Sequence, residues 1–210
     1  MTHPVIEDIR KTLGRSAQTP IGPRPAILAA RRSGPVDSEI EQFLGEIKKL
    51  SGAGQRLAPE GIAGALQALV AERKIKKATL WNTPWLHSLG LAESLRAMHV
   101  ELVSSNADKH ELTHCDLGIT EADFALPETG TIVLRSSAEK PRAVSLLPRV
   151  HLAIISPEAL RADMHQVFAE ARDSHYLVFI TGPSRTADIE LTITLGVHGP
   201  KDLFAWMVIA

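Results

Sequence analysis

A mostly apolar run, His151-Leu152-Ala153-Ile154-Ile155, indicates the fold of this 210-residue chain. An uninterrupted run of this kind, without alternation of polar residues, is typical of a strand that is covered on both faces. Pro157-Glu158 then begin a predicted helix that extends through Ala171, and Tyr176-Leu177-Val178-Phe179-Ile180 is a second buried-strand pattern. The order strand, helix, strand predicts parallel strands that are joined by helical connections.

The alternation of helix and strand patterns continues on both sides of this stretch. Ser38, with Glu41 three residues later, predicts a capped helix start, and Pro59 predicts the first turn of another helix. Two hairpin-like pieces, residues 124–134 and 189–209, indicate that some strands run antiparallel. We therefore expect an α/β fold with a mixed, mostly parallel sheet that helices cover on both faces. The other expected elements are strands at 78–81 and 100–103 and a helix from Thr83 onward.

The first 37 residues differ from the rest of the chain. Residues 5–13 have the apolar spacing of a helix, with Gly14 as its stop. The prolines and glycines between residues 19 and 35 exclude a regular helix or a central strand there. We expect residues 1–37 to form a short helix and a Pro-rich arm, and residues 38–210 to form a single α/β domain. The arm either lies on the surface or docks on a partner or a second copy.

The composition excludes several classes of protein. The 23 Lys and Arg residues nearly balance the 24 Asp and Glu residues, so a basic face for nucleic acid is not expected. The single cysteine, Cys115, cannot form an internal disulfide or supply the ligands of an iron–sulfur cluster or a cysteine-based zinc site. Apolar runs stay well short of the roughly 20 residues of a membrane span, and residues 1–10 do not resemble a signal peptide. We expect a cytoplasmic protein that itself holds no cofactor.

The densest group of polar residues lies in two neighbouring runs, Gly118-Ile119-Thr120-Glu121-Ala122-Asp123 and Glu128-Thr129-Gly130-Thr131. Gly130 permits a backbone geometry that other residues avoid, and the amides and hydroxyls of Thr129 and Thr131 are candidate ligands for an anion. Glu128 is a candidate nucleophile or general base. The alternative is a turn whose polar groups bond only the local backbone.

A second polar stretch directly follows the predicted strand that ends at Ile180. Ligands of open α/β sheets bind beyond the carboxyl ends of the strands, so a role in binding is expected here. The glycine allows close approach of the backbone, the hydroxyls donate hydrogen bonds, and the arginine offers a fork for phosphate or carboxylate. The aspartate would orient the arginine, and the alternative is that this ion pair only stabilises a loop. The candidate ligand-binding residues are Gly182, Ser184, Arg185, Thr186 and Asp188.

Two histidine-containing motifs remain. Gly196-Val197-His198-Gly199-Pro200 places His198 on a constrained turn, where it can titrate near neutral pH or donate to an anion. His198 is therefore a second candidate catalytic residue, and the alternative is a surface histidine without a role. His110-Glu111-Leu112-Thr113-His114 matches the H-E-x-x-H pattern of zinc proteases. Because Gly118 cuts off the helix and a third ligand is not evident, we predict no metal site.

Taken in order, these motifs resemble one known family. They are similar to LUD-domain proteins of the LutC/YkgG group, which is called lactate utilisation protein C. The resemblance covers about Ser38 to Ala210 and is most specific in the C-terminal half. The stretches that carry it are 118–123, 128–131, Leu147-Pro148-Arg149-Val150-His151, 182–190 and 196–200.

The resemblance implies a fold like that of the NagB/RpiA/CoA-transferase group, a Rossmann-like three-layer α/β sandwich. It also implies a role in the oxidation of L-lactate to pyruvate, together with LutA-like and LutB-like iron–sulfur proteins. Because this chain has one cysteine, the iron–sulfur clusters are expected in those partners. The resemblance supplies no proven catalytic residue.

Three functions follow as hypotheses. The first is an accessory component of lactate oxidation that binds a small anionic or nucleotide-like ligand between the 128–131 turn, the 182–186 loop and His198. The second is a stand-alone enzyme of the CoA-transferase or sugar-phosphate-isomerase type that uses Glu128. The third is a non-catalytic interaction module that docks through the Pro-rich arm and the edges of the sheet. A second copy of the chain, in a homo-oligomer, is a further candidate partner.

Overall fold

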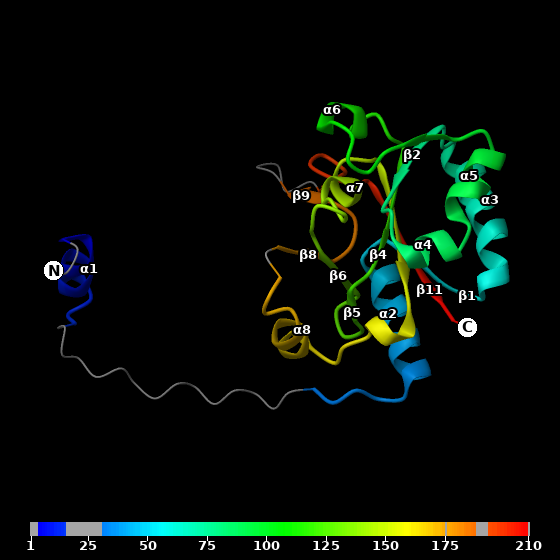
Figure 1. Ribbon diagram of the computed structural model, residues 1–210. Helices are drawn as coiled ribbons and strands as arrows, with labels where there is room; N and C mark the ends of the chain where they lie inside the picture. Colours follow the sequence, from blue (N-terminus) through cyan, green and yellow to red (C-terminus); the bar gives the residue numbers. More distant parts are fainter. Residues whose placement is uncertain (1–3, 16–30, 175, 188–192, 210) are drawn as a thin grey trace. The chain divides into compact units, whose positions relative to one another are not determined.

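The computed structural model describes residues 4–15, 31–174, 176–187 and 193–209 (Figure 1). The chain divides into two compact units, Met1–Ala30 and Arg31–Ala210. In the first unit, α1 (Pro4–Thr12) confirms the helix that the apolar spacing predicts. The apolar side chains of α1 are exposed. The predicted domain boundary after residue 37 stays a prediction.

Six strands form the central sheet in the order β1-β11-β7-β4-β2-β3. Every pairing between neighbours in this described sheet is parallel. β7, which contains the apolar run, is buried along its whole length between β4 and β11. The expectation of a mostly parallel α/β sheet is therefore confirmed. The strands are β1 (Ala53–Leu57), β2 (Lys77–Leu80), β3 (Glu101–Val103), β4 (Leu117–Glu121), β7 (Val150–Ile155) and β11 (Asp202–Val208).

The antiparallel strands lie outside the central sheet, in two small sheets of their own. The first is a three-stranded sheet of β5 (Phe124–Leu126), β6 (Thr131–Arg135) and β8 (Leu177–Ile180). The second is a two-stranded sheet of β9 (Arg185–Ala187) and β10 (Ile193–Leu195). The prediction that β8 is a buried strand was wrong, because β8 is a half-buried edge strand of the three-stranded sheet. The expected hairpin over 189–209 was wrong as well, since β11 joins the central sheet; residues 188–192 lie outside the described residues.

Helices cover both faces of the central sheet. Figure 1 shows α3 and α5 on one side, with α2, α7 and the three-stranded sheet on the other. α2 begins at Val36, so Ser38 lies within its first turn and does not cap it. The predicted helix over 157–171 is broken into two pieces, and Asp163 caps the second. The helical elements are α2 (Val36–Lys49), η1 (Pro59–Gly61), α3 (Ile62–Arg73), α4 (Pro84–Ser88), α5 (Leu91–Ala97), α6 (Lys109–Leu112), α7 (Ala143–Leu146), η2 (Pro157–Ala159) and α8 (Met164–Glu170).

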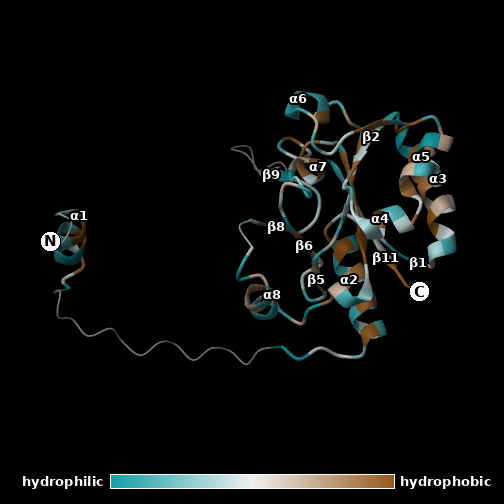
Figure 2. Ribbon diagram, viewed as in Figure 1, coloured by the Kyte–Doolittle hydropathy of each residue, from teal (hydrophilic) through white to brown (hydrophobic). Residues whose placement is uncertain are grey.

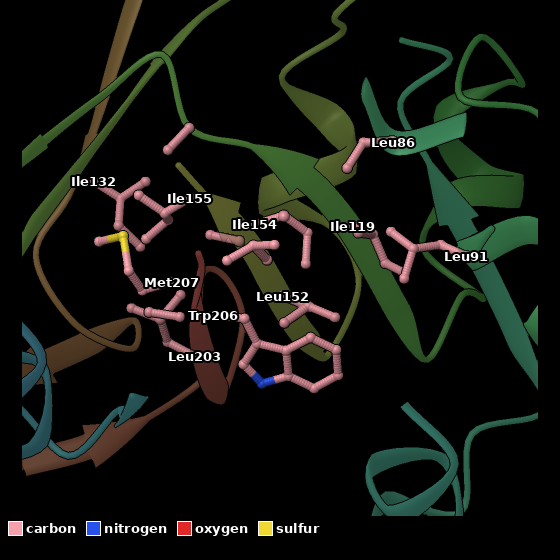
Figure 3. Packing of buried hydrophobic residues seen from close by; sticks show 14 of the residues in the cluster. Leu86, Leu91, Ile119, Ile132, Leu152, Ile154, Ile155, Leu203, Trp206 and Met207 are labelled. Carbon is pink, nitrogen blue, oxygen red and sulfur yellow. The ribbon is translucent and has the colours of Figure 1, made fainter. Parts of the chain in front are cut away.

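The core lies between these layers. Brown and teal alternate along α2 in Figure 2, as expected for a helix that buries one stripe of side chains. Successive residues of a strand point to opposite faces, so Leu152 and Trp206 pack on one side of the sheet and Ile155 and Met207 on the other (Figure 3). Ile132 of β6 joins the second group, which attaches the three-stranded sheet to the central one. In the described part of the chain, helices are too short or too polar to cross a membrane.

The segment that leads into α2 is held by an ion pair. The guanidinium nitrogens of Arg31 donate to both carboxylate oxygens of the buried Glu39 at 2.9 Å, and Arg31 N–H donates to Asp163 at 3.0 Å. The Gly34 N–H also donates to Glu39. Burial would raise the pKa of the Glu39 carboxyl, but the bonds from Arg31 and Gly34 hold that pKa below its usual value. The end of the Pro-rich segment is thus fastened to the domain.

Candidate functional site

The order of the strands predicts where a ligand site lies. From β2 the chain moves outward to β3 and then returns across the sheet to β4, so the direction of winding reverses between β2 and β4. Ligands of doubly wound sheets bind at the carboxyl ends of the strands on either side of such a reversal. Thr83 follows β2, and Glu121 and Asp123 stand at the end of β4.

These side chains form a closed cluster around Lys140, which we call the edge cluster (Thr83, Glu121, Asp123 and Lys140). Lys140 Nζ lies 2.7 Å from Glu121 Oε1 and 3.3 Å from Asp123 Oδ1. The Thr83 hydroxyl donates to Glu121 Oε2 at 2.7 Å, and the Arg135 N–H donates to Asp123 Oδ2 at 2.7 Å. Each of the four carboxylate oxygens therefore has a partner within the protein.

The surroundings of Lys140 keep its ammonium charged. Burial would lower the pKa of Lys140, but Glu121 and Asp123 outweigh burial and raise it. The ammonium also lies 5.4 Å from the centre of the Trp81 ring, whose Nε1–H donates to the Pro141 carbonyl at 3.0 Å. The cluster can hold a proton and brace the sheet edge, and a cavity of about 450 Å³ lies next to Glu121 and Asp123. The sequence pattern identified Glu121 and Asp123 but missed Lys140, for which no local signal exists.

A second site lies where two glycine-bearing loops meet, and we call it the loop pocket. The Ser184 N–H donates to the Pro200 carbonyl and the Gly196 N–H to the Ser184 carbonyl, both at 2.9 Å. The cavity between the loops has a volume of about 270 Å³. The polar side chains that line it belong to Ser145, His151, Thr181, Ser184 and His198.

The loop pocket does not lie at the carboxyl edge of the sheet, where sequence reasoning placed it. Its lining includes His151 and Leu203, the second residues of β7 and β11, so it lies near the amino ends of these strands. The cause is β8, which precedes the 182–186 loop and belongs to the antiparallel sheet. The rule for the carboxyl ends of parallel strands therefore does not apply to this loop.

His151 is a buried polar group of the loop pocket, as is Ser145. Its Nε2 lies 2.9 Å from the Thr120 hydroxyl, and its Nδ1 is buried without a hydrogen-bond partner among the described residues. Burial lowers the pKa of His151 to about 3, so the ring is neutral at physiological pH. A buried nitrogen without a partner is costly, which makes it a candidate contact for a ligand. In the sequence, His151 stands out only as the last residue of the Leu147–His151 stretch, and no local pattern indicates that its ring is buried beside a cavity.

The predicted residues Thr129, Gly130 and Thr131 lie beside the loop pocket, close to the end of α2. The hydroxyls of Thr129, Thr131 and Thr181 form a chain with spacings of 2.7 and 2.8 Å. Gly130 has a φ of 60° and packs so closely that a Cβ atom would lie 2.8 Å from the backbone nitrogen of Ile47. This contact gives the glycine of the 128–131 turn a packing role.

The charged candidates Glu128 and Arg185 do not line the loop pocket. Arg185 donates to the Leu50 carbonyl at the end of α2, which is a helix-capping contact. Glu128 is exposed on its turn, and Thr186 lies in β9. Asp188 lies outside the described residues, so the expected pairing of Asp188 with Arg185 stays a prediction.

The H-E-x-x-H motif does not form a two-histidine helix face. α6 covers only Lys109–Leu112, so His114 lies beyond its end, and both histidines are exposed. The described residues contain no group of three or more side chains suited to a metal ion. Cys115 is buried, and burial raises the pKa of its thiol to about 11. Its reactive thiolate form is therefore scarce at neutral pH.

The fold and its two sites define a Rossmann-like α/β sandwich with a polar carboxyl edge and a separate pocket between loops. The chain belongs to the LUD domain family, whose model matches residues 38–207. The predicted family is thereby confirmed. A crystal structure of a DUF162 family protein from Deinococcus radiodurans shares the fold, with a TM-score of 0.65 and 20% identity over 84% of this chain and 100% of that one.

Several curated relatives are similar in sequence. A lactate utilization protein C from Halalkalibacterium halodurans is 36% identical over 147 residues, which are 65% of this chain and 64% of the relative. One from Shouchella clausii is 38% identical over 135 residues, which are 60% of this chain and 59% of the relative. The chain thus spans about three fifths of the length of these relatives.

Proposed function

We propose that this chain takes part in lactate utilisation and that the loop pocket binds a small hydroxy or keto acid. The names of the relatives from Halalkalibacterium halodurans and Shouchella clausii support the process. One observation carries the ligand proposal: Ser184 and His198 come from two different loops and line the same cavity. A pocket with a few convergent polar groups on an apolar wall is typical of small-molecule sites.

The lining of the loop pocket matches the parts of such an acid. His198 is exposed at the cavity and can donate to a carboxylate, as can the Ser184 hydroxyl. His151 lines the cavity, and in this proposal the buried, unpartnered Nδ1 of its neutral ring meets a hydroxyl or keto oxygen, as acceptor or donor according to its tautomer. Val178 and Ile180 provide apolar surface for a methyl group. Carboxylate, oxygen and methyl would each have a partner.

Electron transfer in this proposal belongs to LutA-like and LutB-like iron–sulfur partner proteins. The one cysteine of the chain is buried with a raised pKa, so it is poorly suited to redox chemistry or cluster binding. The expected contribution of this chain is therefore to bind the acid rather than to transfer its electrons.

Calorimetric titration of the full chain with L-lactate and with pyruvate tests the ligand proposal. We expect at least one of the acids to bind, and Ser184→Ala and His198→Ala to weaken binding about tenfold each, because each removes a hydrogen bond to a charged group. His114→Ala is the matched control, since His114 is exposed and does not line the pocket. If neither acid binds the unmodified chain, or if both pocket variants bind like the control, the proposal fails.

Arg185→Ala separates two roles of this residue. As an anion clamp, Arg185 would be needed for binding. As the group that caps α2 at Leu50, it would affect stability by about 0.5–1.5 kcal/mol and leave the affinity unchanged. We expect the second result. The hypothesis of a stand-alone enzyme stays a prediction. Glu128, the residue on which it depends, is exposed and lines neither the loop pocket nor the cavity at the edge cluster.

A further inference from the structure

A third cavity, which we call the β2–β3 cavity, opens at the carboxyl ends of β2 and β3. Its volume is about 290 Å³. It lies at the same edge of the sheet as the reversal in winding, where doubly wound folds bind ligands, and it shares no residue with the loop pocket. Its polar lining residues are Asn82, His87, Arg96, Ser104, Ser105 and Asn106.

The charge of this cavity favours an anion. Arg96 contributes a permanent positive charge, and among the residues that the structure describes no carboxylate lines the cavity. The acidic neighbour of Arg96 is Glu93, at 3.6 Å, and both side chains are more than 60% exposed, so this ion pair is weak. The cavity beside the edge cluster has the opposite character, because Glu121, Asp123 and Glu158 line it.

Several uncharged donors accompany Arg96. Ser105 is only 6% exposed and lines the cavity. The Ser104 oxygen accepts the Asn106 N–H at 3.3 Å, which leaves the Ser104 hydroxyl proton free for a ligand. The Asn82 side-chain oxygen bonds the His87 ring, so the amide group of Asn82 can donate elsewhere. One guanidinium with this set of donors suits the several oxygens of a phosphate better than the two oxygens of a carboxylate.

The shape of the cavity indicates what else the ligand contains. Ala92 and Val103 are buried, whereas Asn82, His87 and Arg96 are exposed, so the apolar part is deep and the charged part is near solvent. A volume of about 290 Å³ is at the lower end of the range for small-molecule pockets. The ligand is therefore small and has an apolar or planar body next to its anionic group.

From these observations we infer that the β2–β3 cavity binds a small organic phosphate, up to the size of a mononucleotide. The phosphate contacts Arg96 and the donors of Ser104 and Asn82, and the body of the ligand lies on Ala92 and Val103 with Ser105 as its polar contact. This site is separate from the proposed acid site in the loop pocket, so either can fail without the other.

The test is calorimetric titration of the full chain with AMP, adenosine and inorganic phosphate. We expect AMP to bind, inorganic phosphate to compete with it, and adenosine to bind at least tenfold more weakly than AMP. Arg96→Ala is expected to weaken AMP binding at least tenfold, because a charge-assisted contact is lost. Arg172→Ala, which removes an exposed arginine that does not line the cavity, is expected to bind AMP like the unmodified chain.

Two further variants keep the result interpretable. Ser105→Ala removes a hydroxyl from the apolar end and is expected to weaken AMP and adenosine alike, whereas His198→Ala, in the loop pocket, is expected to leave AMP binding unchanged. Thermal unfolding of each variant shows that it is folded. The inference is overturned if AMP and inorganic phosphate both fail to bind, if Arg96→Ala binds AMP like Arg172→Ala, or if adenosine binds as tightly as AMP.

Discussion

The edge cluster and the loop pocket differ in whether their polar side-chain atoms have hydrogen-bond partners within the protein. In the edge cluster, each oxygen of Glu121 and Asp123 has a partner, and Lys140 lies between them. In the loop pocket, His151 leaves one ring nitrogen without a partner among the described residues. A network in which the groups satisfy one another stabilises the fold, whereas an unpaired buried group costs stability unless a ligand supplies the partner.

The helix α7 connects the two regions. It packs on Gly118 of β4 and carries Ser145 and Leu146, which line the loop pocket, while Lys140 of the edge cluster lies shortly before it. The comparison therefore predicts a hierarchy. A change where α7 packs on β4 harms both regions, a change at His151 alters the pH dependence of stability, and a change at Lys140 affects the edge cluster alone.

The largest effect is expected from Gly118→Ala. The added Cβ would lie 1.9 Å from the Val144 carbonyl oxygen, so α7 must move off the sheet. We expect a loss of about 3 kcal/mol or more in the free energy of unfolding, measured by urea denaturation. Gly64→Ala in α3 is the control; beyond the backbone of its own helix, the added Cβ meets no atom of the described residues within 4 Å, and it should stabilise by about 0.5–1 kcal/mol. Equal stability of the two variants would contradict the close packing of α7.

The next effect is a pH dependence at His151. The folded protein holds this ring neutral with a pKa of about 3, whereas the unfolded chain protonates it below its ordinary pKa of about 6.5. Protonation thus favours the unfolded state, and stability falls as the pH drops from 6.5 toward 3, by about 1.4 kcal/mol for each pH unit.

Urea denaturation at pH 6.5 and pH 5 tests this dependence. His151→Asn is expected to be less stable at pH 6.5 but to lose about 2 kcal/mol less than the unmodified chain on going to pH 5. His114→Ala, at an exposed position, should leave the loss on acidification as it is in the unmodified chain. An unchanged pH slope in His151→Asn would show that the ring is not buried in its neutral form.

The smallest effect is expected from Lys140→Met. The substitution leaves Glu121 and Asp123 without their shared cation, and the side chains are only 15–23% exposed. We expect a cost of about 1–2 kcal/mol in the free energy of unfolding, below that for a fully buried pair. Lys49→Met, which breaks the pair between the 72% exposed Lys49 and Glu46, should cost less than about 0.5 kcal/mol. Similar costs for both would mean that the edge cluster adds nothing beyond a surface ion pair.

Much of the fold could be predicted from sequence periodicity. The break in the helix expected over 157–171 could not. The middle of this helix is unwound where Asp163 accepts the Arg31 N–H and Arg161 pairs with Glu170 at 2.7 Å. The first of these contacts joins residues 132 positions apart, which no local pattern reports. The error at β8 has a related cause, since Phe179 of β8 is 37% exposed and packs on Phe168, itself 50% exposed, instead of in the core.

The candidate sites show the same limit. The glycine-bearing loops around Ser184 and His198 could be identified from residue types alone, and they do line one cavity. Lys140 has no distinguishing neighbours in the sequence. The sequence suggested an anion-binding role for Arg185. Its contact with Leu50 could not be predicted, because the two residues are 135 positions apart.

The sequence by itself determined the parallel α/β architecture and the family, because apolar runs, helix periodicity and short motifs are local properties of the chain. Only the tertiary structure decided which strands share a sheet, and hence that the 182–186 loop lies near the amino ends of β7 and β11 while Glu121 and Asp123 lie at the carboxyl edge. Strand order and burial arise from contacts between distant segments. Such contacts also set the pKa of His151 and the partners of Lys140, so these properties emerge only when the chain is folded.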